Sequence, residues 1–276
     1  MGPTPPSGGT RRRRQLGLAA MAAVVLLGTA GCSADTEWGR LGMPVPATQQ
    51  GQDVILPFWQ NTWITAWIVG GITWGLMAWV VIVYRRRKGD GLPRQLQYNL
   101  PIEVLYTFTP VVIVLVLFMF TFRDTNTIND LTDDSQRSVG VVGFQWSWTF
   151  NYLDDGVYDT GTPEQPPTLW LPVDERIRFE LTSPDVIHSF WVPAFLYKQD
   201  VVPGRLNQFE ATPNRIGTYA GKCAELCGVD HSRMLFTVKI VSQQDYEAHM
   251  AALRSLGQTG VLQSGRVSTK STGARL

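Results

Sequence analysis

Two long apolar segments in the first half of the chain constrain its fold more than any other feature. Residues 58–84 carry no charged side chain, and residues 104–122 are again apolar. The hydrocarbon core of a bilayer is about 30 Å thick, and about 20 helical residues cross it. The sequence therefore predicts two membrane-spanning helices, at about 58–84 and 103–122.

The charge of the loop between these segments predicts their orientation. Residues 85–88 read Arg-Arg-Arg-Lys, and Arg94 follows. Basic loops stay on the cytoplasmic side, so both outer ends of the hairpin 58–123 lie outside the cytoplasm. We therefore expect a multi-pass protein of the plasma membrane with an extracytoplasmic C-terminal domain. The polar residues 32–57 in front of the first span are expected to form an extended extracytoplasmic linker.

The N-terminus has the features of an export signal. Arg11–Arg14 precede a short apolar run, Leu16–Leu27, and an Ala-Gly pair then precedes Cys32. A basic start, a short apolar core and a small-residue exit describe a secretory signal, here residues 1–31. A cysteine directly after Ala-Gly resembles a bacterial lipoprotein box, which predicts lipidation of Cys32. A plain signal peptide is the alternative, and the arginines fit either general or twin-arginine export.

The second half of the chain has the pattern of an all-β domain. Alternate residues from Val142 to Tyr152 are large and apolar, which predicts one half-buried strand with Trp146 on the face of the core aromatics. Short strands separated by turn signals predict a β-sandwich over residues 137–242. Residues 243–276 are expected to form a short helix and a disordered tail. The further strands are expected at 169–173, 177–181, 208–211, 218–220 and 234–241.

The loop Cys223–Met234 gathers soft metal ligands. It reads Cys-Ala-Glu-Leu-Cys-Gly-Val-Asp-His-Ser-Arg-Met. Thiolates and imidazole suit copper, and Cys, His and a weak Met form the blue-copper ligand set, here with one cysteine added. Because two thiolates can bridge two metals, the spacing indicates a binuclear copper centre. His231 lies in the loop and His249 is expected at the surface of the terminal helix, which leaves His188 as the second imidazole.

Three other interpretations of this loop are open on the residues alone. Cys223 and Cys227 could form a disulfide in an exported protein. A Cys2His2 zinc site would leave Met234 without a role, and its usual spacing differs. A thioredoxin-like copper chaperone also carries Cys-x3-Cys, but its chain should alternate strands with helices.

The ligand order and the two spans together resemble subunit II of the haem–copper cytochrome c oxidases. The resemblance covers about residues 55–245, and the segments Gln-Trp-Ser-Trp at 145–148 and Asp-Val-Ile-His-Ser at 185–189 match as well. Lipoprotein-type processing suggests the actinobacterial branch. The implied fold is a two-helix transmembrane hairpin followed by an all-β cupredoxin-like sandwich that carries the binuclear CuA centre. The implied metal ligands are His188, Cys223, Glu225, Cys227, His231 and Met234.

The resemblance also implies individual roles. The two thiolates would bridge both coppers; one copper would add His188 and Met234, and the other His231 and the main-chain carbonyl of Glu225. The Glu225 carboxylate would bind a magnesium ion at the interface with subunit I. Electrons would enter through Trp146. Glu103 would lie near the mouth of a proton channel of the partner subunit.

The implied function is that of the subunit through which electrons enter a terminal respiratory oxidase. The donor would be cytochrome c, or a cytochrome c domain of a bc1-type complex. Electrons would pass to the haem of subunit I, where oxygen reduction is coupled to proton pumping, so this chain alone is expected to be catalytically silent. A quinol oxidase subunit II would share the fold without the copper ligands. The formal net charge of +1 gives no indication of nucleic acid binding.

Overall fold

The structure is a computed structural model, in which residues 36–85, 95 and 97–263 are described. The expected signal peptide 1–31 and Cys32 lie outside these residues. The chain divides into two compact units, residues 1–45 and 46–276. In the first unit, residues 36–42 form a hydrogen-bonded turn, in which Arg40 N donates to Thr36 O at 3.0 Å. All elements below belong to the second unit.

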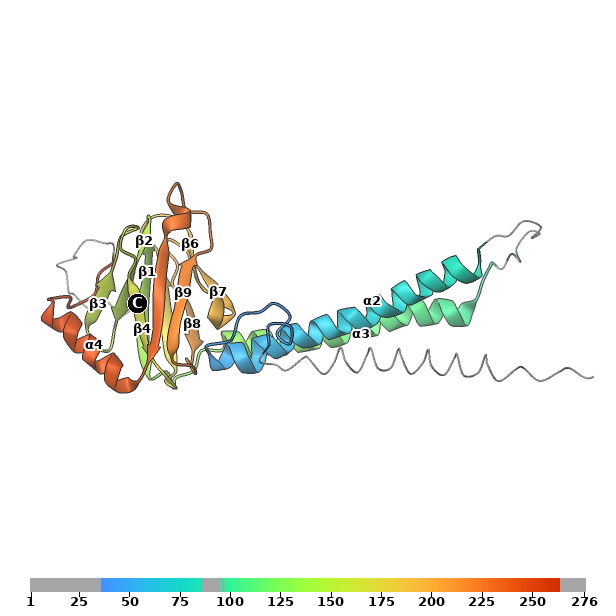
Figure 1. Cartoon of the computed structure of the whole chain (residues 1–276), viewed down its shortest axis with the longest axis horizontal. Coiled ribbons are helices and arrows are strands. Elements are labelled where there is room, and N and C mark those ends of the chain that lie inside the picture. The colour runs from blue at the N-terminus through green and yellow to red at the C-terminus, as the bar shows by residue number, and fades with distance from the viewer. Residues whose placement is uncertain (1–35, 86–94, 96, 264–276) are drawn as a thin grey trace, which may run out of the picture. The chain divides into compact units, whose positions relative to one another are not determined.

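Two long helices carry the apolar segments (Figure 1). A short π-helix, η1 (Gly51–Ile55), continues directly into α2 (Leu56–Val83), and α3 (Leu100–Asn129) follows the basic loop. In the described part of the chain, these are the two helices long and apolar enough to cross a membrane. Their large apolar side chains are mostly exposed, which suits contact with lipid or a partner rather than with water. The predicted transmembrane hairpin is confirmed as a pair of helices.

The segment directly before α2 is not an extended linker as expected. The main chain of residues 46–50 lies against the sandwich, where Ala47 N donates to Ala194 O at 2.8 Å and Gln49 N donates to Thr212 O at 2.9 Å. The Ala47 side chain is fully buried in the sandwich core. A small apolar residue and satisfied backbone groups make this segment part of the folded domain.

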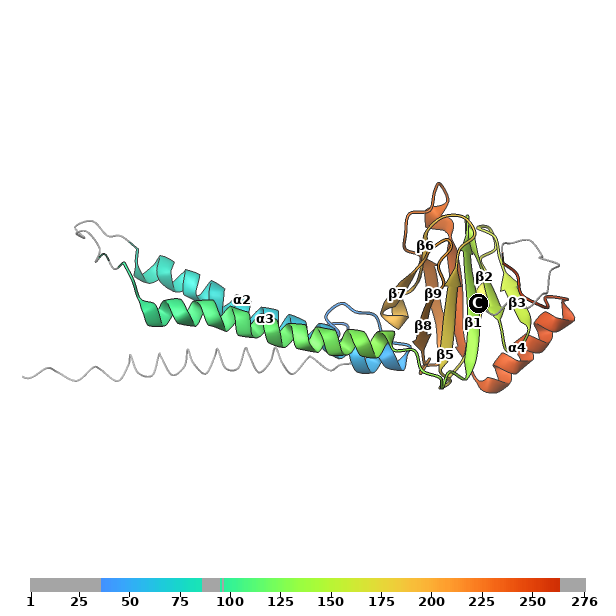
Figure 2. The same ribbon diagram turned by 180° about the vertical axis from the view of Figure 1, so that it is seen from behind.

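The domain that follows the two helices is a sandwich of two five-stranded sheets, as predicted from the short strands (Figure 2). One sheet has the strand order β3-β2-β1-β5-β8 and the other β4-β10-β9-β6-β7. The first sheet consists of β1 (Arg137–Phe144), β2 (Ser147–Tyr152), β3 (Val157–Thr160), β5 (Ile177–Thr182) and β8 (Asn207–Ala211). The second consists of β4 (Thr168–Pro172), β6 (His188–Val192), β7 (Tyr197–Val201), β9 (Gly217–Cys223) and β10 (Leu235–Val241). Of these, β3, β6 and β7 were not predicted from the sequence.

Aromatic side chains from both sheets fill the core between them. Trp148 and Phe150 of β2 meet Phe236 of β10 edge to face, at ring-centroid distances of 5.3 and 5.4 Å. Phe190 of β6 stacks on Phe236 at 4.9 Å. Such pairs add about 0.5–1.5 kcal/mol each beyond their burial. The core therefore fixes the ends of β6, β9 and β10, where the candidate ligands lie.

The single strand expected across residue 145 is wrong. β1 ends at Phe144 and β2 begins at Ser147, and the two residues face each other in an antiparallel hairpin. Gln145 and Trp146 form the turn between them. The apolar alternation continues through this turn because both strands face the same core, so the pattern alone does not reveal the reversal. As a consequence, Trp146 lies half-buried at the end of the sandwich.

The C-terminal region is more ordered than expected. Helix α4 (Gln243–Ser255) is capped by Ser242, whose hydroxyl accepts from Asp245 N at 3.2 Å. Beyond it, the Asn151 side chain donates to Leu262 O at 3.1 Å and accepts from Leu262 N at 2.8 Å. His249, expected at the surface, is half-buried and stacks on Trp170 at 4.2 Å. Residues 257–263 are therefore part of the folded domain, and the rest of the expected tail lies outside the described residues.

Candidate metal centre

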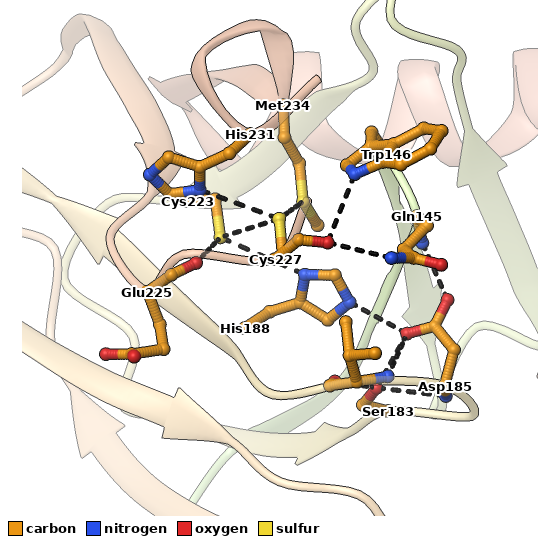
Figure 3. Close-up of polar contacts among 11 residues, drawn as sticks. Gln145, Trp146, Ser183, Asp185, His188, Cys223, Glu225, Cys227, His231 and Met234 are labelled. Carbon is orange, nitrogen blue, oxygen red and sulfur yellow. Dashed lines mark hydrogen bonds and ion pairs between the residues drawn. The ribbon is translucent and has the colours of Figure 1, made fainter. Parts of the chain in front are cut away.

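The soft ligands of the sequence converge at one end of the sandwich (Figure 3). Cys223 is the last residue of β9, and β10 begins at Leu235, so the loop between these antiparallel strands holds the rest. Cys223 N donates to Met234 O at 3.0 Å, which closes the loop at its base. His188 is the first residue of β6, whose Phe190 is paired with Cys223. Strand pairing thus brings His188 to the loop.

The candidate donor atoms lie within a few ångströms of one another. The Sγ atoms of Cys223 and Cys227 are 3.9 Å apart, so no disulfide joins these two thiols in this structure. The ligand atoms of His188, Cys223 and Cys227 lie within 4.8 Å of one another. The remaining contacts join His188 Nδ1 to Cys223 Sγ (3.9 Å), His231 Nδ1 to Cys227 Sγ (3.5 Å) and Met234 Sδ to Cys227 Sγ (3.7 Å).

Most of this cluster is shielded from solvent. His188 and Met234 are fully buried, both cysteines are nearly so, and His231 is partly exposed. The Glu225 main-chain carbonyl accepts from the Cys223 thiol at 3.3 Å, whereas the Glu225 carboxylate is exposed and points away from the sulfur atoms (Figure 3). The carbonyl and the carboxylate of Glu225 are thus turned toward different surroundings.

A carboxylate outside the predicted ligand set orients His188. Asp185 Oδ1 lies 2.8 Å from His188 Nε2, which turns Nδ1 of the same ring toward the cysteines. Burial opposes protonation of His188, but the hydrogen bonds with Cys223 and Asp185 outweigh it, so the His188 pKa lies above its ordinary value. Burial raises the pKa of Asp185, but the hydrogen bonds from Gln145 N and His188 outweigh burial. The pKa of Asp185 therefore lies below its ordinary value. Ligand histidines commonly have such a second partner.

The two thiols differ in acidity when no metal is bound. Burial raises the pKa of Cys223, but the hydrogen bonds with His188 and with main-chain groups lower it to about 7. Burial and the neighbouring Cys223 charge both raise the pKa of Cys227. Two adjacent buried thiolates therefore need positive charge between them, which a bound metal would supply.

The donor set fits copper. Thiolate and thioether sulfur with imidazole nitrogen is the combination that copper sites use in proteins. The Met234 side chain is fully buried and points into the cluster, whereas a Cys2His2 zinc site would give it no role. The absence of alternating helices and strands in the described sandwich also disfavours the thioredoxin-like chaperone.

The hairpin turn of Trp146 contacts the ligand loop directly. Trp146 Nε1 donates to the Cys227 main-chain oxygen at 3.2 Å, and Gln145 Nε2 donates to the same oxygen at 2.8 Å. Gly228 has a φ of +127°, and a Cβ there would lie 2.9 Å from Trp146 Nε1. Glycine at this position therefore allows the indole to approach the loop.

Sequence reasoning gave no role to Gln145, Asp185 or Gly228. A carboxylate three residues before a ligand histidine was the available signal for Asp185. Gln145 belongs to the segment 145–148 that resembles the family, but its contact with Cys227 was not predicted, because Cys227 is remote in the chain and the turn was not expected.

Glu103 lies far from this cluster in the chain and is placed in the first turn of α3. Its carboxylate accepts from Asn99 N at 2.9 Å, which satisfies one of the free amides at the helix start. This contact gives Glu103 a structural role in the described part of the chain.

Comparisons with known proteins agree with this architecture. Residues 36–123 match the family described as "Cytochrome C oxidase subunit II, transmembrane domain", and residues 163–241 match "Cytochrome C oxidase subunit II, periplasmic domain". A probable cytochrome c oxidase subunit 2 of Streptomyces coelicolor is 46% identical, over 93% of this chain and 92% of that protein. Cytochrome c oxidase subunit 2 of Mycobacterium tuberculosis is 32% identical, over 88% and 83% respectively.

Among solved structures, one similar chain is the periplasmic domain of subunit II of cytochrome oxidase (CoxB) of Bradyrhizobium japonicum. It is 28% identical, and the match covers 46% of this chain and 99% of that chain with a TM-score of 0.42.

Proposed function

The chain belongs to the cytochrome c oxidase subunit II family, of actinobacterial type, and we propose that its Cys223–Met234 loop holds the binuclear CuA centre of a terminal oxidase. In this proposal the protein is a membrane-anchored subunit of an oxidoreductase complex. It accepts electrons from cytochrome c, or from a cytochrome c domain of a bc1-type complex. It delivers them to the haem of subunit I, where oxygen reduction is coupled to proton pumping.

One observation carries the proposal: two free cysteines, two histidines and a buried methionine meet within a few ångströms at one end of the sandwich. Cys223 and Cys227 would bridge the two coppers, His188 and Met234 would complete one, and His231 with the Glu225 carbonyl the other. When bound, the copper pair supplies one-electron transfer in which the electron is shared through the thiolates.

The protein contributes to such transfer by fixing the orientation of the ligands and by excluding water from them. The Asp185 contact fixes the His188 ring, and the aromatic core excludes water from the buried side of the loop. Ligands that hardly move on reduction reduce the reorganisation that electron transfer requires. Hydrogen bonds and the apolar surroundings of the sulfur atoms tune the potential.

Trp146 is proposed as the point where electrons enter. It is half-buried at the end of the sandwich, and its indole N–H is bonded to the carbonyl of Cys227. This contact supports a short route from the protein surface through a hydrogen bond and a few covalent bonds to a bridging thiolate.

The remaining assignments extend the same proposal. The hairpin 58–123 is a multi-pass anchor in the plasma membrane, the cupredoxin domain is 137–242, and the copper loop lies on the extracytoplasmic side. Residues 1–31 are removed as a lipoprotein-type signal, and Cys32 is lipidated. The exposed Glu225 carboxylate is free to bind magnesium at the interface with subunit I. Glu103 lies at the mouth of a proton channel of that subunit.

Electron paramagnetic resonance of the purified, copper-loaded protein tests the central claim. We expect hyperfine splitting from two equivalent coppers that share one unpaired electron. A spectrum of a single copper would overturn the binuclear assignment. Loss of the shared signal in Cys227→Ser, with a folded sandwich by circular dichroism, would assign it to this loop.

A further inference from the structure

A groove lies between the two membrane helices, along the N-terminal half of α2 and the C-terminal half of α3. The two helices run side by side in both views (Figure 1 and Figure 2). The groove has a volume of about 550 Å³, which is in the range of small-molecule sites in proteins. Neither the metal centre nor the route through Trp146 uses any residue that lines this groove.

The depth of the groove matches one leaflet of a bilayer. Among its α3 residues, Arg123 directly follows the apolar segment 104–122, and Val112 lies deepest. At about 1.5 Å per helical residue, this stretch is about 16 Å long. Half of the hydrocarbon core of a bilayer is about 15 Å thick. The part of the groove below Arg123 therefore extends from the headgroup level to about the middle of the membrane.

The deep part of the groove is apolar. Val112, Val116 and Phe120 line it from α3. Thr62 and Thr65 line it from α2, and their hydroxyls donate to main-chain oxygens of the preceding turn at 2.8 and 2.9 Å. The hydrogen bonds of these hydroxyls are thus satisfied within their own helix. An apolar groove one leaflet deep suits a lipid acyl chain.

One polar side chain of the groove lacks a partner. Asn61 lies within the apolar segment 58–84, about one helical turn from its start. Among the residues that the structure describes, its carboxamide forms no hydrogen bond. A polar group in hydrocarbon without a hydrogen bond is costly, so a bound molecule should supply a partner. The ester oxygens of a phospholipid lie at this depth, just below its headgroup.

Charges of both signs lie at the mouth of the groove. Arg123 bonds to a single oxygen of Asp124 through Nε and one terminal nitrogen, each at 2.8 Å, and its side chain is 66% exposed. A guanidinium has five N–H donors, so others remain for a phosphate. Asp53 of η1 also lines the mouth, and it belongs to no ion pair within the described part of the chain. Because two carboxylates accompany one guanidinium, an anionic headgroup is repelled and an added ammonium group is attracted.

We propose that this groove holds one phospholipid with an amine headgroup, of the phosphatidylethanolamine class, in the leaflet next to the sandwich. Arg123 binds the phosphate and Asp53 the ammonium group. Asn61 donates to an ester oxygen, and the apolar walls enclose one acyl chain. The inference goes beyond electron transfer and rests only on the membrane anchor of the proposed function.

The chain offers matched controls for this site. Val114 is on the same helix as Val116 and is 63% exposed, but it does not line the groove. Val116→Trp therefore fills the groove, whereas Val114→Trp places the same bulk outside it. Arg85, which is exposed and lies just after the other end of α2, is the control for the charge removed in Arg123→Gln.

The experiment measures lipid binding to the full chain, purified in mild detergent and stripped of lipid. Phosphatidylethanolamine or phosphatidylglycerol is added back, and the first bound lipid is titrated by native mass spectrometry. We expect the wild type to bind phosphatidylethanolamine more tightly than phosphatidylglycerol. Val116→Trp should abolish this first binding step, whereas Val114→Trp should leave it unchanged. Circular dichroism of both variants checks that the helices are intact.

Substitutions of the polar groups test the headgroup assignment. Arg123→Gln should weaken binding of both lipids about tenfold, because a charge-assisted hydrogen bond to phosphate is lost. Arg85→Gln should bind as the wild type does. Asp53→Asn should remove the preference for the amine headgroup while phosphatidylglycerol binds at least as well as before. Asn61→Leu, which keeps a good helix former, should weaken binding of both lipids.

Three results would overturn the inference. Equal lipid binding in Val116→Trp and Val114→Trp would show that the lipids only surround the helices. Tighter binding of phosphatidylglycerol than of phosphatidylethanolamine to the wild type would refute the amine headgroup. Loss of another subunit from the whole oxidase in Val116→Trp, with its phosphatidylethanolamine content unchanged, would assign the groove to a protein helix. Lipid binding does not depend on copper, so failure of the CuA assignment is recognised separately, by the paramagnetic signal.

Discussion

Trp146 donates its indole N–H to the main-chain oxygen of Cys227 at 3.2 Å, so a residue from the first sheet's hairpin turn is bonded to the ligand loop of the second sheet. Gln145 donates to the same oxygen. Two side chains of the turn therefore donate to one carbonyl oxygen of the loop. A substitution in the turn should for this reason alter the position of the loop, and the reverse.

Replacing Trp146 by Phe should separate electron input from copper binding. Phenylalanine keeps an aromatic ring but lacks the indole N–H donor, and the loss of this hydrogen bond costs about 1 kcal/mol of stability. We expect slower reduction of the copper centre by cytochrome c in stopped-flow measurements, with the paramagnetic spectrum intact. Trp170→Phe, on the outer face near α4, is the control and should leave the rate unchanged. An unaltered rate in Trp146→Phe would remove this residue from the route.

The sequence predicted the parts of the fold that depend on local pattern. Apolar length indicated both spans, and period-two alternation indicated a sandwich. It did not predict the hairpin at residue 145, because apolar side chains on both strands of a hairpin face the same core and the alternation runs on through the turn. Nor did it predict the packing of Leu262, which depends on an amide from Asn151, remote in the chain.

The candidate site was predictable to a similar extent. Ligand types and spacing identified the loop, and the scarcity of histidines pointed to His188. The Asp185 and Gln145 contacts depend on the packing of β1, β6 and the ligand loop at one end of the sandwich. These segments are remote in the chain, so the local sequence pattern does not predict the contacts between them. Glu103 shows the reverse case, in which a residue singled out from the sequence has a helix-start contact in the structure.

Met234→Leu should keep the copper centre but change its potential. Met234 is fully buried, and leucine has a similar volume, so the substitution should cost less than about 1.5 kcal/mol. Loss of the thioether removes a weak ligand, and the potential of such copper sites responds to that ligand. Spectroelectrochemical titration should show a shifted midpoint with two coppers still bound. An unchanged midpoint would argue that Met234 is not a ligand.

The packing of α4 should depend on pH through His249. Burial first, and then the nearby Lys239 charge, lower the pKa of His249 below its ordinary value of 6.5. His249 therefore binds a proton more readily in the unfolded state than in the folded state. Its contribution to the stability of the folded state is present above about pH 6.5 and is lost as the pH falls through the folded-state pKa. Hydrogen exchange in α4 should accelerate over this range.

His249→Phe, which retains a ring to stack on Trp170, is the variant that checks this pH dependence. It should abolish the acid-dependent acceleration of exchange in α4 while the packing of the helix at neutral pH is kept. Persistence of the acceleration in the variant would assign it to another group.

Truncation should show that the residues after α4 belong to the fold. Deleting residues 257–276 would remove both partners of the buried Asn151 amide, and an unsatisfied buried polar group costs about 1–3 kcal/mol. Thermal unfolding of the purified chain should show a lower midpoint. Deleting only residues 264–276 is the control and should leave the midpoint unchanged, since the Leu262 contacts remain.

Asp185→Ala should weaken copper binding without removing any proposed ligand. Asp185 lies 2.8 Å from His188 Nε2 and accepts from Gln145 N at 2.7 Å, so it holds both the ligand ring and the turn that carries Trp146. Loss of such a partner typically costs roughly 10–100-fold in metal affinity, which competition with a chelator of known affinity would measure. Glu180→Ala, which removes a surface carboxylate bonded to Gln208, is the control. Asp185→Asn should restore part of the affinity, because an amide can still accept from Gln145 N although its charge is gone. Equal affinity in Asp185→Ala and the wild type would show that the loop alone orients His188.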